Sequence, residues 1–497
     1  MILALFLLRF LWPLVMAGMT VYAFRRSWRW EHGAPMPENL FSDKPRAKET
    51  AVWVDPSVLP ILLLVILLVW WAFDGTNGVE RFFALLLDVM VIISLYFLVL
   101  ICLLPLLRRY FSARACATLW ILPVFMFWQA HMLYQNAPVP RWVIFIPSHI
   151  LRPLYLVWGI GFCAVFAAKT ISHFIFRHRV LSAATPVRDR EVLELFEREL
   201  QRLEFSYPVR LVISPAVAAP LSMGVTKRGR VTVLPDRSFT HQQLQFIFSH
   251  EIHHLQRRDV GNKIFFAFCQ ALCWFNPLMW VAVSKASDDL ELSCDEIVLE
   301  GMDESLRKQY AQLLLDTAGS ARGFTTCLSA TAQTMRYRLR NVMSLRKRHL
   351  GALLLGIAMF LCVVSYGLVA VSHDKGTVAE LITEQRTAAD VQSVYHQPEG
   401  WGYLERATVR DAEGLFAYLA SLDVEKLSRA NEINVNSEQR LALFLTGYGT
   451  MQLQFHDQIL MVHHVHDGLH EAYYYLRSPL DWETVNSFLE PHNLPIE

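Results

Sequence analysis

Six long apolar stretches constrain this chain more than any other feature of its 497 residues. Each approaches or exceeds the roughly 20 residues that a helix needs to cross a bilayer. The six stretches are Met1–Phe24, Ser57–Phe73, Phe82–Leu107, Cys116–Tyr134, Pro153–Ser172 and Leu350–Val371. Only 18% of the residues are charged, against about 25% in a typical soluble protein. The sequence therefore predicts a mostly α-helical membrane protein with about six transmembrane helices, and it excludes an ordinary soluble enzyme.

The first stretch is predicted to be a permanent membrane anchor. It lacks a basic start, its apolar part is too long for a signal peptide, and Arg25 and Arg26 follow it directly. Two charged residues, Arg9 and Asp88, lie inside apolar stretches. For both we favour polar contacts within the helix bundle over an ion pathway, and the Arg9 side chain could instead reach the membrane surface.

The basic residues between the stretches predict which side of the membrane each loop occupies, because cytoplasmic loops are enriched in Lys and Arg. They concentrate after the first, third and fifth stretches and before the sixth, at Arg25, Arg26, Arg29, Lys44, Arg46, Lys48, Arg108, Arg109, Arg114, Arg177, Arg179, Arg346, Lys347 and Arg348. The two other loops carry only Arg81, Arg141 and Arg152. We therefore expect a membrane domain (1–176) with about five helices, a cytoplasmic domain (177–349), a transmembrane helix (350–372) and a small extracytoplasmic α+β domain (373–497).

Cysteine usage and net charge agree with this arrangement. All eight cysteines precede residue 373, and their spacing suggests neither a zinc ribbon nor a disulfide framework. The formal net charge of +1 gives no global case for a nucleic-acid binder. Direct binding of nucleic acid is therefore not expected.

The cytoplasmic segment is expected to contain both helices and short strands. A helix is predicted to start with Thr185 as its cap and Pro186 at its first position. Val209–Ile213 and Val231–Leu234 are predicted strands. A second helix, Thr240–Arg257, begins with the capping-box pattern of Thr and a Gln three residues later.

This second helix carries the sequence His250-Glu251-Ile252-His253-His254, an HExxH motif. His250 and His254 lie one helical turn apart on the same face, so both can reach one metal ion. Glu251 flanks that face and can touch a water on the metal, which suits it for general-base catalysis. His253 is interpreted as structural or exposed. The alternative is a solvated, histidine-rich helix face.

A third ligand is expected downstream, because catalytic zinc favours three protein ligands and an open position. Glu291 lies on another predicted helix and would complete a His₂Glu set for one Zn²⁺. Asp295, one turn later, is placed to hydrogen-bond a ligating imidazole. The alternative is an ordinary acidic helix face, since further acids lie nearby at Asp288, Asp289, Glu296 and Glu300. Taken with the HExxH motif, the pattern favours zinc.

Between the two motifs lies a nearly continuous apolar segment, Ile264–Val283. A further membrane crossing here would place Glu291 on the opposite side from His250. Asn276-Pro277 interrupts the segment and leaves two arms shorter than a span. We interpret it as a helical hairpin at the inner membrane surface, with a buried pair of core helices as the alternative.

The motifs of this segment resemble those of a known family, the BlaR/MecR-type membrane metallopeptidases. The resemblance covers about residues 180–349 and rests on three motifs in order: His250-Glu251-x-x-His254 with Arg257-Arg258-Asp259, then Phe275-Asn276-Pro277-Leu278-x-Trp280, then Glu291-Leu292-x-Cys294-Asp295. It implies a cytoplasmic gluzincin domain between transmembrane segments, which an extracytoplasmic signal activates to destroy a transcriptional repressor. It also implies residue roles: zinc ligands His250, His254 and Glu291, general base Glu251, orienting acid Asp295, and a structural hydrogen-bonding role for Asp259.

The chain departs from the family pattern in two respects. We count five apolar stretches before the peptidase segment, where well-known members have three, and both odd numbers give the same topology. The tail of about 125 residues is too short for a penicillin-binding-like sensor, and its sole Ser-x-x-Lys match is Ser372–Lys375. β-Lactam sensing is therefore not expected. Some members cut themselves, but a membrane anchor explains the basic run Arg336–Arg348 more simply.

The tail is predicted to be a small α+β domain. Asp411–Leu422 and Asp481–Leu489 are expected helices. An antiparallel meander is predicted from Leu441–Leu445, Met451–Phe455, Ile459–His466 and Leu469–Leu476, with Asp467-Gly468 as a two-residue turn. In that register His464 would pair with Glu471. Five histidines lie near this hairpin (His456, His463, His464, His466 and His470), and we favour a polar strand face over a metal- or proton-sensing patch.

Together these features predict a zinc endopeptidase of the bacterial inner membrane, with its peptidase domain in the cytoplasm and a sensor-like domain outside. The expected partners are membrane lipid and a protein substrate such as a transcriptional repressor; a homodimer and a monomer both remain open. Two alternatives are a quality-control protease that needs no external trigger and a receptor or scaffold that works by binding alone.

Overall fold

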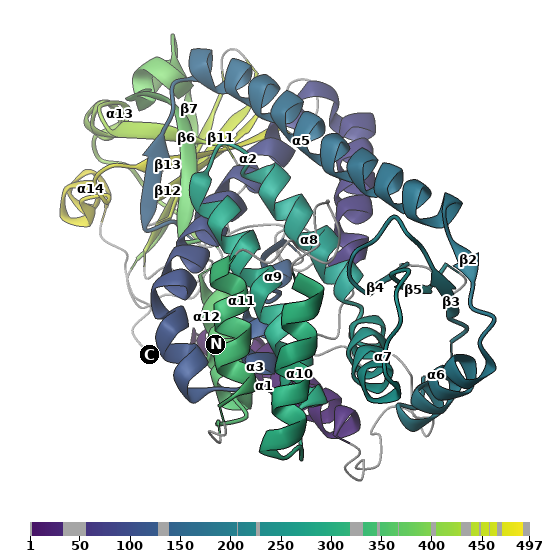
Figure 1. Ribbon diagram of the computed structural model, residues 1–497. Helices are drawn as coiled ribbons and strands as arrows, with labels where there is room; N and C mark the ends of the chain where they lie inside the picture. Colours follow the sequence, from purple (N-terminus) through teal and green to yellow (C-terminus); the bar gives the residue numbers. More distant parts are fainter. Residues whose placement is uncertain are drawn as a thin grey trace.

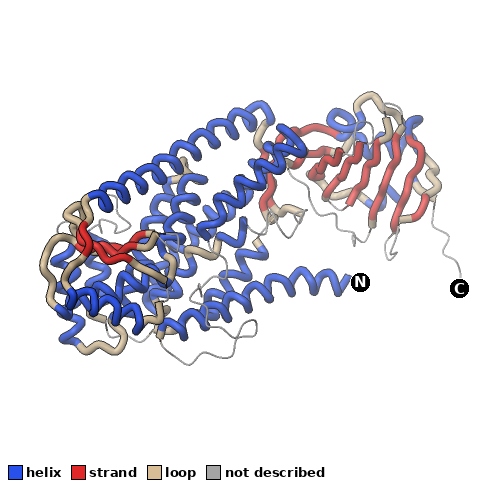
Figure 2. Tube along the Cα trace, turned by 90° about the vertical axis from the view of Figure 1, so that its right-hand side faces the viewer, coloured by secondary structure: helices blue, strands red, loops and turns tan. Residues whose placement is uncertain are grey.

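The computed structural model describes residues 2–32, 56–127, 139–205, 207–224, 229–318, 332–344, 348–365, 367–398, 404–428, 439–446, 449–456, 458–464 and 470–490. The molecule is elongated, with a large sheet at one end and a small sheet at the other (Figures 1 and 2). Long helices run between the two sheets, so elements far apart in the sequence meet in the middle of the molecule.

Three described helical segments are long and apolar enough to cross a membrane. The first two, Pro56–Thr76 and Gly78–Tyr110, belong to helix α2 (Leu59–Tyr110), which follows the short 3₁₀ turn η1 (Pro56–Val58). Gly75 divides α2, because its φ of 54° and ψ of −132° are not helical. The third is α5 (Ser148–Ser182). The apolar composition of these segments makes each a membrane candidate, as predicted.

The predicted count of six spans is not confirmed. The first stretch lies in helix α1 (Ile2–Glu31), which is not among the three candidates. The fourth corresponds to a shorter apolar helix, Ala113–Phe127, which begins with α3 (Ala113–Leu119), and residues 128–138 lie outside the described part. The sixth is interrupted: helix α12 ends after only 13 residues, Ala352–Val364, and strand β6 (Val369–Thr377) begins within the predicted span.

The segment after α5 forms a small sheet and a helix. Its strands are β2 (Thr185–Pro186), β3 (Arg210–Ile213), β4 (Leu221–Met223) and β5 (Val231–Leu234), in the order β2-β3-β5-β4. The predicted helix start at Thr185 is wrong, because Thr185 and Pro186 pair with β3. Helix α6 (Arg190–Arg202) instead begins after Asp189, whose carboxylate accepts the backbone N–H of Glu191.

Five helices complete this region: α7 (His241–Gln256), α8 (Asp259–Leu272), α9 (Pro277–Val298), α10 (Glu304–Ala318) and α11 (Ala332–Val342). The predicted break at Asn276-Pro277 is confirmed. Pro277 is the first residue of α9, and the Asn276 side chain accepts the backbone N–H of Leu278.

The predicted hairpin packs against the candidate membrane helices. Its Phe268 ring lies 5.8 Å from the ring of Phe162 on α5, and the indole of Trp158 donates to the Leu272 carbonyl over 2.6 Å. The hairpin is therefore buried where it faces α5, as the alternative of a buried helix pair predicts. Three residues at its tip, Phe275, Trp280 and Val281, remain about half exposed.

The tail forms a nine-stranded sheet in the order β1-β6-β9-β13-β12-β11-β10-β7-β8. Its strands after β6 are β7 (Val391–Gln397), β8 (Glu405–Arg406), β9 (Asp423–Leu427), β10 (Arg440–Leu445), β11 (Met451–His456), β12 (Ile459–His464) and β13 (His470–Leu476). The predicted antiparallel meander β10–β13 and both helices are confirmed, as α13 (Ala412–Ala420) and α14 (Trp482–Phe488).

Two features of this sheet differ from expectation. Its first strand, β1 (Trp142–Phe145), comes from the chain just before α5 and pairs in parallel with β6. The predicted pairing of His464 with Glu471 is wrong: His463 lies opposite Glu471, and His464 lies opposite His470. Residues 465–469, which include His466 and the predicted turn Asp467-Gly468, lie outside the described part.

Candidate metal centre

Helix α7 holds the HExxH motif in a fixed position because both its start and its apolar face are anchored. The Thr240 hydroxyl accepts the Gln243 backbone N–H, and the Gln243 side chain accepts the Thr240 N–H, which is the predicted capping box. Ile247, Phe248 and Ile252 are buried in the core beneath the small sheet. His250 and His254 lie next to each other on this anchored helix, with their rings 4.7 Å apart.

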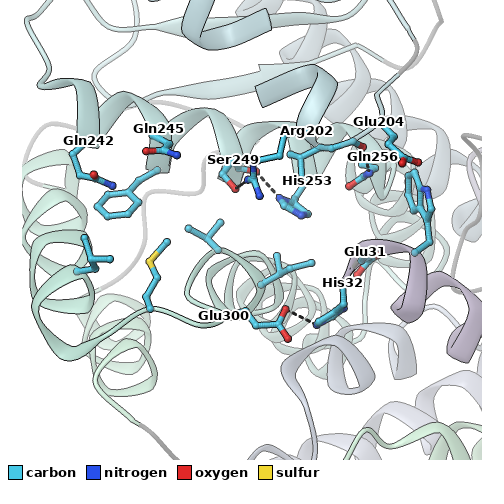
Figure 3. A pocket seen from close by; sticks show the side chains of 17 residues that line it. Glu31, His32, Arg202, Glu204, Gln242, Gln245, Ser249, His253, Gln256 and Glu300 are labelled. Atoms are coloured by element: carbon cyan, nitrogen blue, oxygen red, sulfur yellow. Dashed lines mark hydrogen bonds and ion pairs between the residues drawn. The ribbon is translucent and has the colours of Figure 1, made fainter. Parts of the chain in front are cut away.

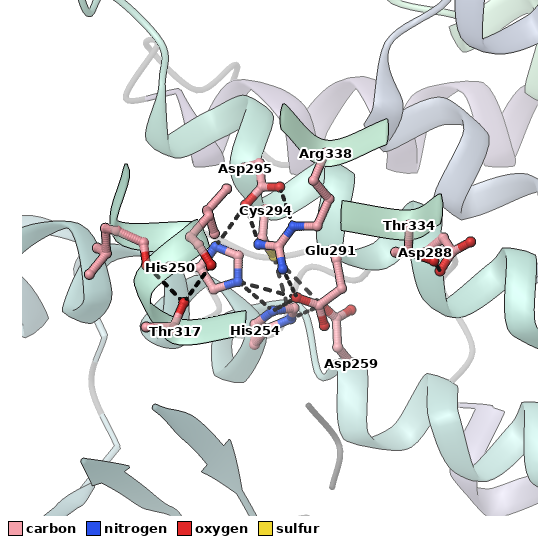
Figure 4. A network of polar contacts seen from close by, with 12 residues as sticks. His250, His254, Asp259, Asp288, Glu291, Cys294, Asp295, Thr317, Thr334 and Arg338 are labelled. Atoms are coloured by element: carbon pink, nitrogen blue, oxygen red, sulfur yellow. Dashed lines mark hydrogen bonds and ion pairs between the residues drawn. The ribbon is translucent and has the colours of Figure 1, made fainter. Parts of the chain in front are cut away.

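Three potential ligand atoms from α7 and α9 converge at one point (Figure 4). Nε2 of His250 lies 3.1 Å from Nε2 of His254. Oε2 of Glu291 lies 3.4 Å from the first nitrogen and 3.6 Å from the second. Ligand atoms at zinc distances of about 2.0–2.1 Å in a tetrahedral set are about 3.3 Å apart. The donor set and its spacing therefore fit a single zinc ion.

The other ring nitrogen of each histidine has an acidic or phenolic partner. Nδ1 of His254 lies 2.7 Å from Oδ2 of Asp259, and Nδ1 of His250 lies 3.1 Å from the Tyr310 hydroxyl. An Nδ1–H that donates to these oxygens leaves the Nε2 lone pair free, which is the tautomer a metal needs. Asp295 is 3.5 Å from Nδ1 of His250 and also accepts the Tyr310 hydroxyl over 2.7 Å.

Basic side chains surround the two carboxylates of α9. Arg338 on α11 donates to both oxygens of Asp295, over 2.6 and 2.7 Å, and lies 3.6 Å from Oε2 of Glu291. Lys263 on α8 lies 3.5 Å from Oε1 of Glu291. Burial alone would raise the pKa of the Glu291 carboxyl, but protonated His254, hydrogen bonds from both histidines and the Lys263 ammonium outweigh it and hold that pKa well below its usual range. Glu291 is thus kept in the anionic form that binds cations.

Glu251 lies between the two histidines in sequence and is 5% exposed. Its neighbours on α7, His250 and His253, are also buried, at 8% and 2% exposed. The HExxH motif is therefore an interior feature of the fold, and the alternative of a solvated histidine-rich face is wrong.

The neighbouring acids of α9 have separate structural partners. Asp289 accepts from Arg108 and from the Trp120 indole, both over 2.7 Å. Asp288 accepts the Thr334 hydroxyl, and Glu296 accepts the backbone N–H of Ala113 over 2.7 Å. These contacts dock α9 onto the ends of α2 and α3. The alternative of an ordinary acidic face therefore describes α9 poorly, because these three carboxylates are engaged.

Tyr310 and Arg338 are the residues that sequence reasoning missed. Tyr310 belongs to no motif, and Arg338 lies in the basic run that was interpreted as a membrane anchor. Both touch the site from helices that follow α9. Cys294, which is part of the third motif, also lies close, with its sulfur 3.4 Å from Nδ1 of His254.

Comparison with known proteins points to one family. Residues 129–342 match the Peptidase M56 family, described as BlaR1 peptidase M56. This match bears out the resemblance to BlaR/MecR-type membrane metallopeptidases that the motifs indicate, and it implies a metallopeptidase. The matched region includes His250, His254 and Glu291, and it also includes Tyr310 and Arg338.

Curated relatives share the same region at low identity. The regulatory protein BlaR1 of Bacillus licheniformis is 24% identical over 184 residues, and its namesake from Staphylococcus aureus is 22% identical over 197 residues. The methicillin resistance protein MecR1 of Staphylococcus aureus is 22% identical over 178 residues. The matches cover 34–37% of this chain and 29–33% of the relatives, so the chain spans only about a third of their length.

Proposed function

Residues 129–342 match the BlaR1 peptidase M56 family, and from this we propose that the chain is a zinc-dependent membrane endopeptidase. It would transmit an extracytoplasmic signal by cleaving a cytoplasmic regulator. His250, His254 and Glu291 are the proposed zinc ligands, and Glu251 is the proposed general base. The substrate class is a protein, with a transcriptional repressor as the leading candidate. The proposed arrangement keeps the peptidase region (177–349) in the cytoplasm and the tail (373–497) outside a bacterial inner membrane.

The observation that carries the proposal is the convergence of two histidine nitrogens and one glutamate oxygen within a zinc ion's reach. When bound, zinc lowers the pKa of a water molecule and polarises a peptide carbonyl. Glu251 would take the proton of the attacking water and deliver it to the leaving amine. Asp259 and Tyr310 would hold the two imidazoles in the required tautomer, and Arg338 would hold Asp295 in place.

The connection between the two sheets supports signalling over an unregulated protease. Strand β1, at the edge of the tail sheet, leads into α5 after two residues. At the other end of α5, Val180 is buried against Met223 and Val231 of the small sheet, and its carbonyl accepts the Ser214 hydroxyl over 2.9 Å. One continuous helix therefore joins the tail sheet to the peptidase region (Figure 1).

The decisive test compares cytoplasmic proteins cut in cells that express the wild type or Glu251→Gln. We expect Glu251→Gln to keep its zinc and lose cleavage, and Glu291→Ala to lose its zinc. Full cleavage by the first variant, or unchanged zinc in the second, would defeat the assignment. Cleavage of damaged membrane proteins instead of a regulator would indicate quality control, and identical protein patterns under every stimulus would indicate a receptor or scaffold.

A further inference from the structure

A buried carboxylate at the end of α1 joins two arginines that lie far away in the sequence. Oε2 of Glu31 accepts from Arg257 over 2.8 Å, and its Oε1 lies 2.8 Å from Arg114. The side chains of Glu31 and Arg257 are 1% and 2% exposed. Burial raises the pKa of the Glu31 carboxyl, but the two guanidiniums outweigh burial and hold that pKa below its usual range.

Arg257 connects this carboxylate to both ligand-bearing helices. It is the residue that ends α7, and its guanidinium donates to the Ser293 hydroxyl of α9 over 2.6 Å. The same nitrogen lies 3.6 Å from the sulfur of Cys294, which is itself 3.4 Å from Nδ1 of His254. Glu31 is therefore linked to a proposed zinc ligand through Arg257 and Cys294.

The ion pair lies beside a cavity of about 800 Å³ between the end of α1 and α7. Trp30, Glu31 and His32 line one side of it, and His253 and Gln256 of α7 line another (Figure 3). The Glu31–Arg257 pair therefore joins α1 to α7 beside this cavity, and loss of Glu31 would leave Arg257 as a buried charge without this carboxylate.

Helix α1 also has a close connection to the tail. It packs along α12, where a Cβ at Gly356 would come within 2.7 Å of Val21, so the two backbones approach closely. α12 is followed by β6 of the tail sheet. Helix α1 thus contacts α12, which leads into the tail sheet, and reaches α7 through Glu31, although it lies outside the matched region 129–342.

We infer that Glu31 is a positioning residue of the proposed metal centre: it holds Arg257 and thereby fixes the spacing of α7 and α9. This inference rests on the proposed zinc site. It predicts that part of the zinc affinity of the peptidase region comes from helix α1, and that displacement of α1 by the tail would loosen the site.

The test measures zinc affinity of the full chain in detergent, by competition with a chelator, for the wild type and Glu31→Gln. Changes to groups that orient metal ligands typically cost 10–100-fold in metal affinity, so we expect a loss of about 10-fold. Cobalt spectra of the same proteins report the geometry of the site, and we expect the band positions to shift. In an Arg257→Gln background, Glu31→Gln should have no further effect.

Glu300→Gln is the matched control. Glu300 lies just after α9 and pairs over 3.2 Å with His32, the residue that follows α1, so it also links the end of α1 to a ligand-bearing helix, but its side chain is 53% exposed. We expect its zinc affinity and cobalt spectrum to equal those of the wild type. If Glu31→Gln does not fold, Glu31→Asp keeps the charge but shortens the reach, and a smaller loss of affinity is expected.

Wild-type affinity in Glu31→Gln, or in a folded Glu31→Asp when Glu31→Gln fails to fold, would overturn the inference. Equal losses in Glu31→Gln and Glu300→Gln would also overturn it, because they would show a general effect of charge at this end of α1. Failure of the wild type itself to bind one zinc ion would instead overturn the proposed function. The two failures are therefore distinguishable.

Discussion

The Tyr310 hydroxyl donates a hydrogen bond to Oδ1 of Asp295 over 2.7 Å, from a helix that carries no recognisable motif. The Tyr310 hydroxyl oxygen also lies 3.1 Å from Nδ1 of His250. Burial, followed by the nearby Asp295 carboxylate, raises the pKa of Tyr310 well above its usual range, so the phenol keeps its proton. One side chain therefore orients an imidazole and satisfies a buried acid.

Tyr310→Phe should weaken zinc binding by about 10-fold, because His250 loses the partner that orients it. The fold should persist, since the ring still fills the space beside Phe246, 5.5 Å away. Chelator competition measures the affinity. Tyr395→Phe in the tail sheet is the control and should bind zinc as the wild type does. Unchanged affinity in Tyr310→Phe would show that Asp295 alone orients His250.

Arg338→Met should destabilise the chain by about 3–5 kcal/mol, because it leaves the buried Asp295 carboxylate without its two-pronged partner. The loss should be smaller when Asp295→Asn is present as well, since the uncompensated charge is then gone. Unfolding in detergent, followed by circular dichroism, measures both variants. Equal losses in the single and double variants would rule out a charge effect.

Removal of zinc should lower the stability of the peptidase region. A ligand present at 100 times its dissociation constant stabilises a protein by about 2.7 kcal/mol. Chelation should therefore reduce the melting temperature of the wild type, and added zinc should restore it. Glu291→Ala should melt at one temperature with or without the chelator. A chelator effect of equal size in Glu291→Ala would place the stabilising metal elsewhere.

Gly161→Ala should disturb the contact between α5 and the hairpin. A Cβ at this position would lie 2.2 Å from the Trp274 ring, and overpacking of this kind costs about 1–3 kcal/mol. Trp274→Phe should restore part of the lost stability by removing the obstructing ring. Gly159→Ala is the control, because its Cβ would meet only Phe83 at an ordinary 3.6 Å. Thermal unfolding compares the wild type, Gly161→Ala, Gly161→Ala with Trp274→Phe, and Gly159→Ala.

Local signals in the sequence predicted local structure well. The capping pattern at Thr240 and Gln243, the break at Asn276-Pro277 and the convergence of the three proposed ligand residues all depend on spacing along one or two helices. Thr185 was assigned wrongly because pairing with β3 overrides a good helix-start pattern. The predicted bounds of the sixth span differ for a similar reason, because its last residues, from Val369 on, belong to strand β6 of the tail sheet.

Long-range contacts could not be predicted from periodicity. Tyr310 and Arg338 reach the site only because α10 and α11 pack against α7 and α9, and nothing in their own segments marks that arrangement. The register of His463 and His464 follows from how β12 pairs with β13, which the alternation of residues along one strand does not fix. Glu31 is the extreme case, because its partner Arg257 lies 226 positions away.

The parallel pairing of β1 with β6 has a practical consequence for anyone who wishes to study the tail by itself. A fragment that begins at residue 373 would lack β1 and the first four residues of β6, Val369–Ser372. The fragment would therefore lack one end of its sheet and expose unpaired backbone groups of β6 and β9 at the new edge. Unpaired strand edges favour association with other chains. Ligand screens on such a fragment would measure aggregation as well as binding, so the tail is best studied in a chain that keeps β1 and all of β6.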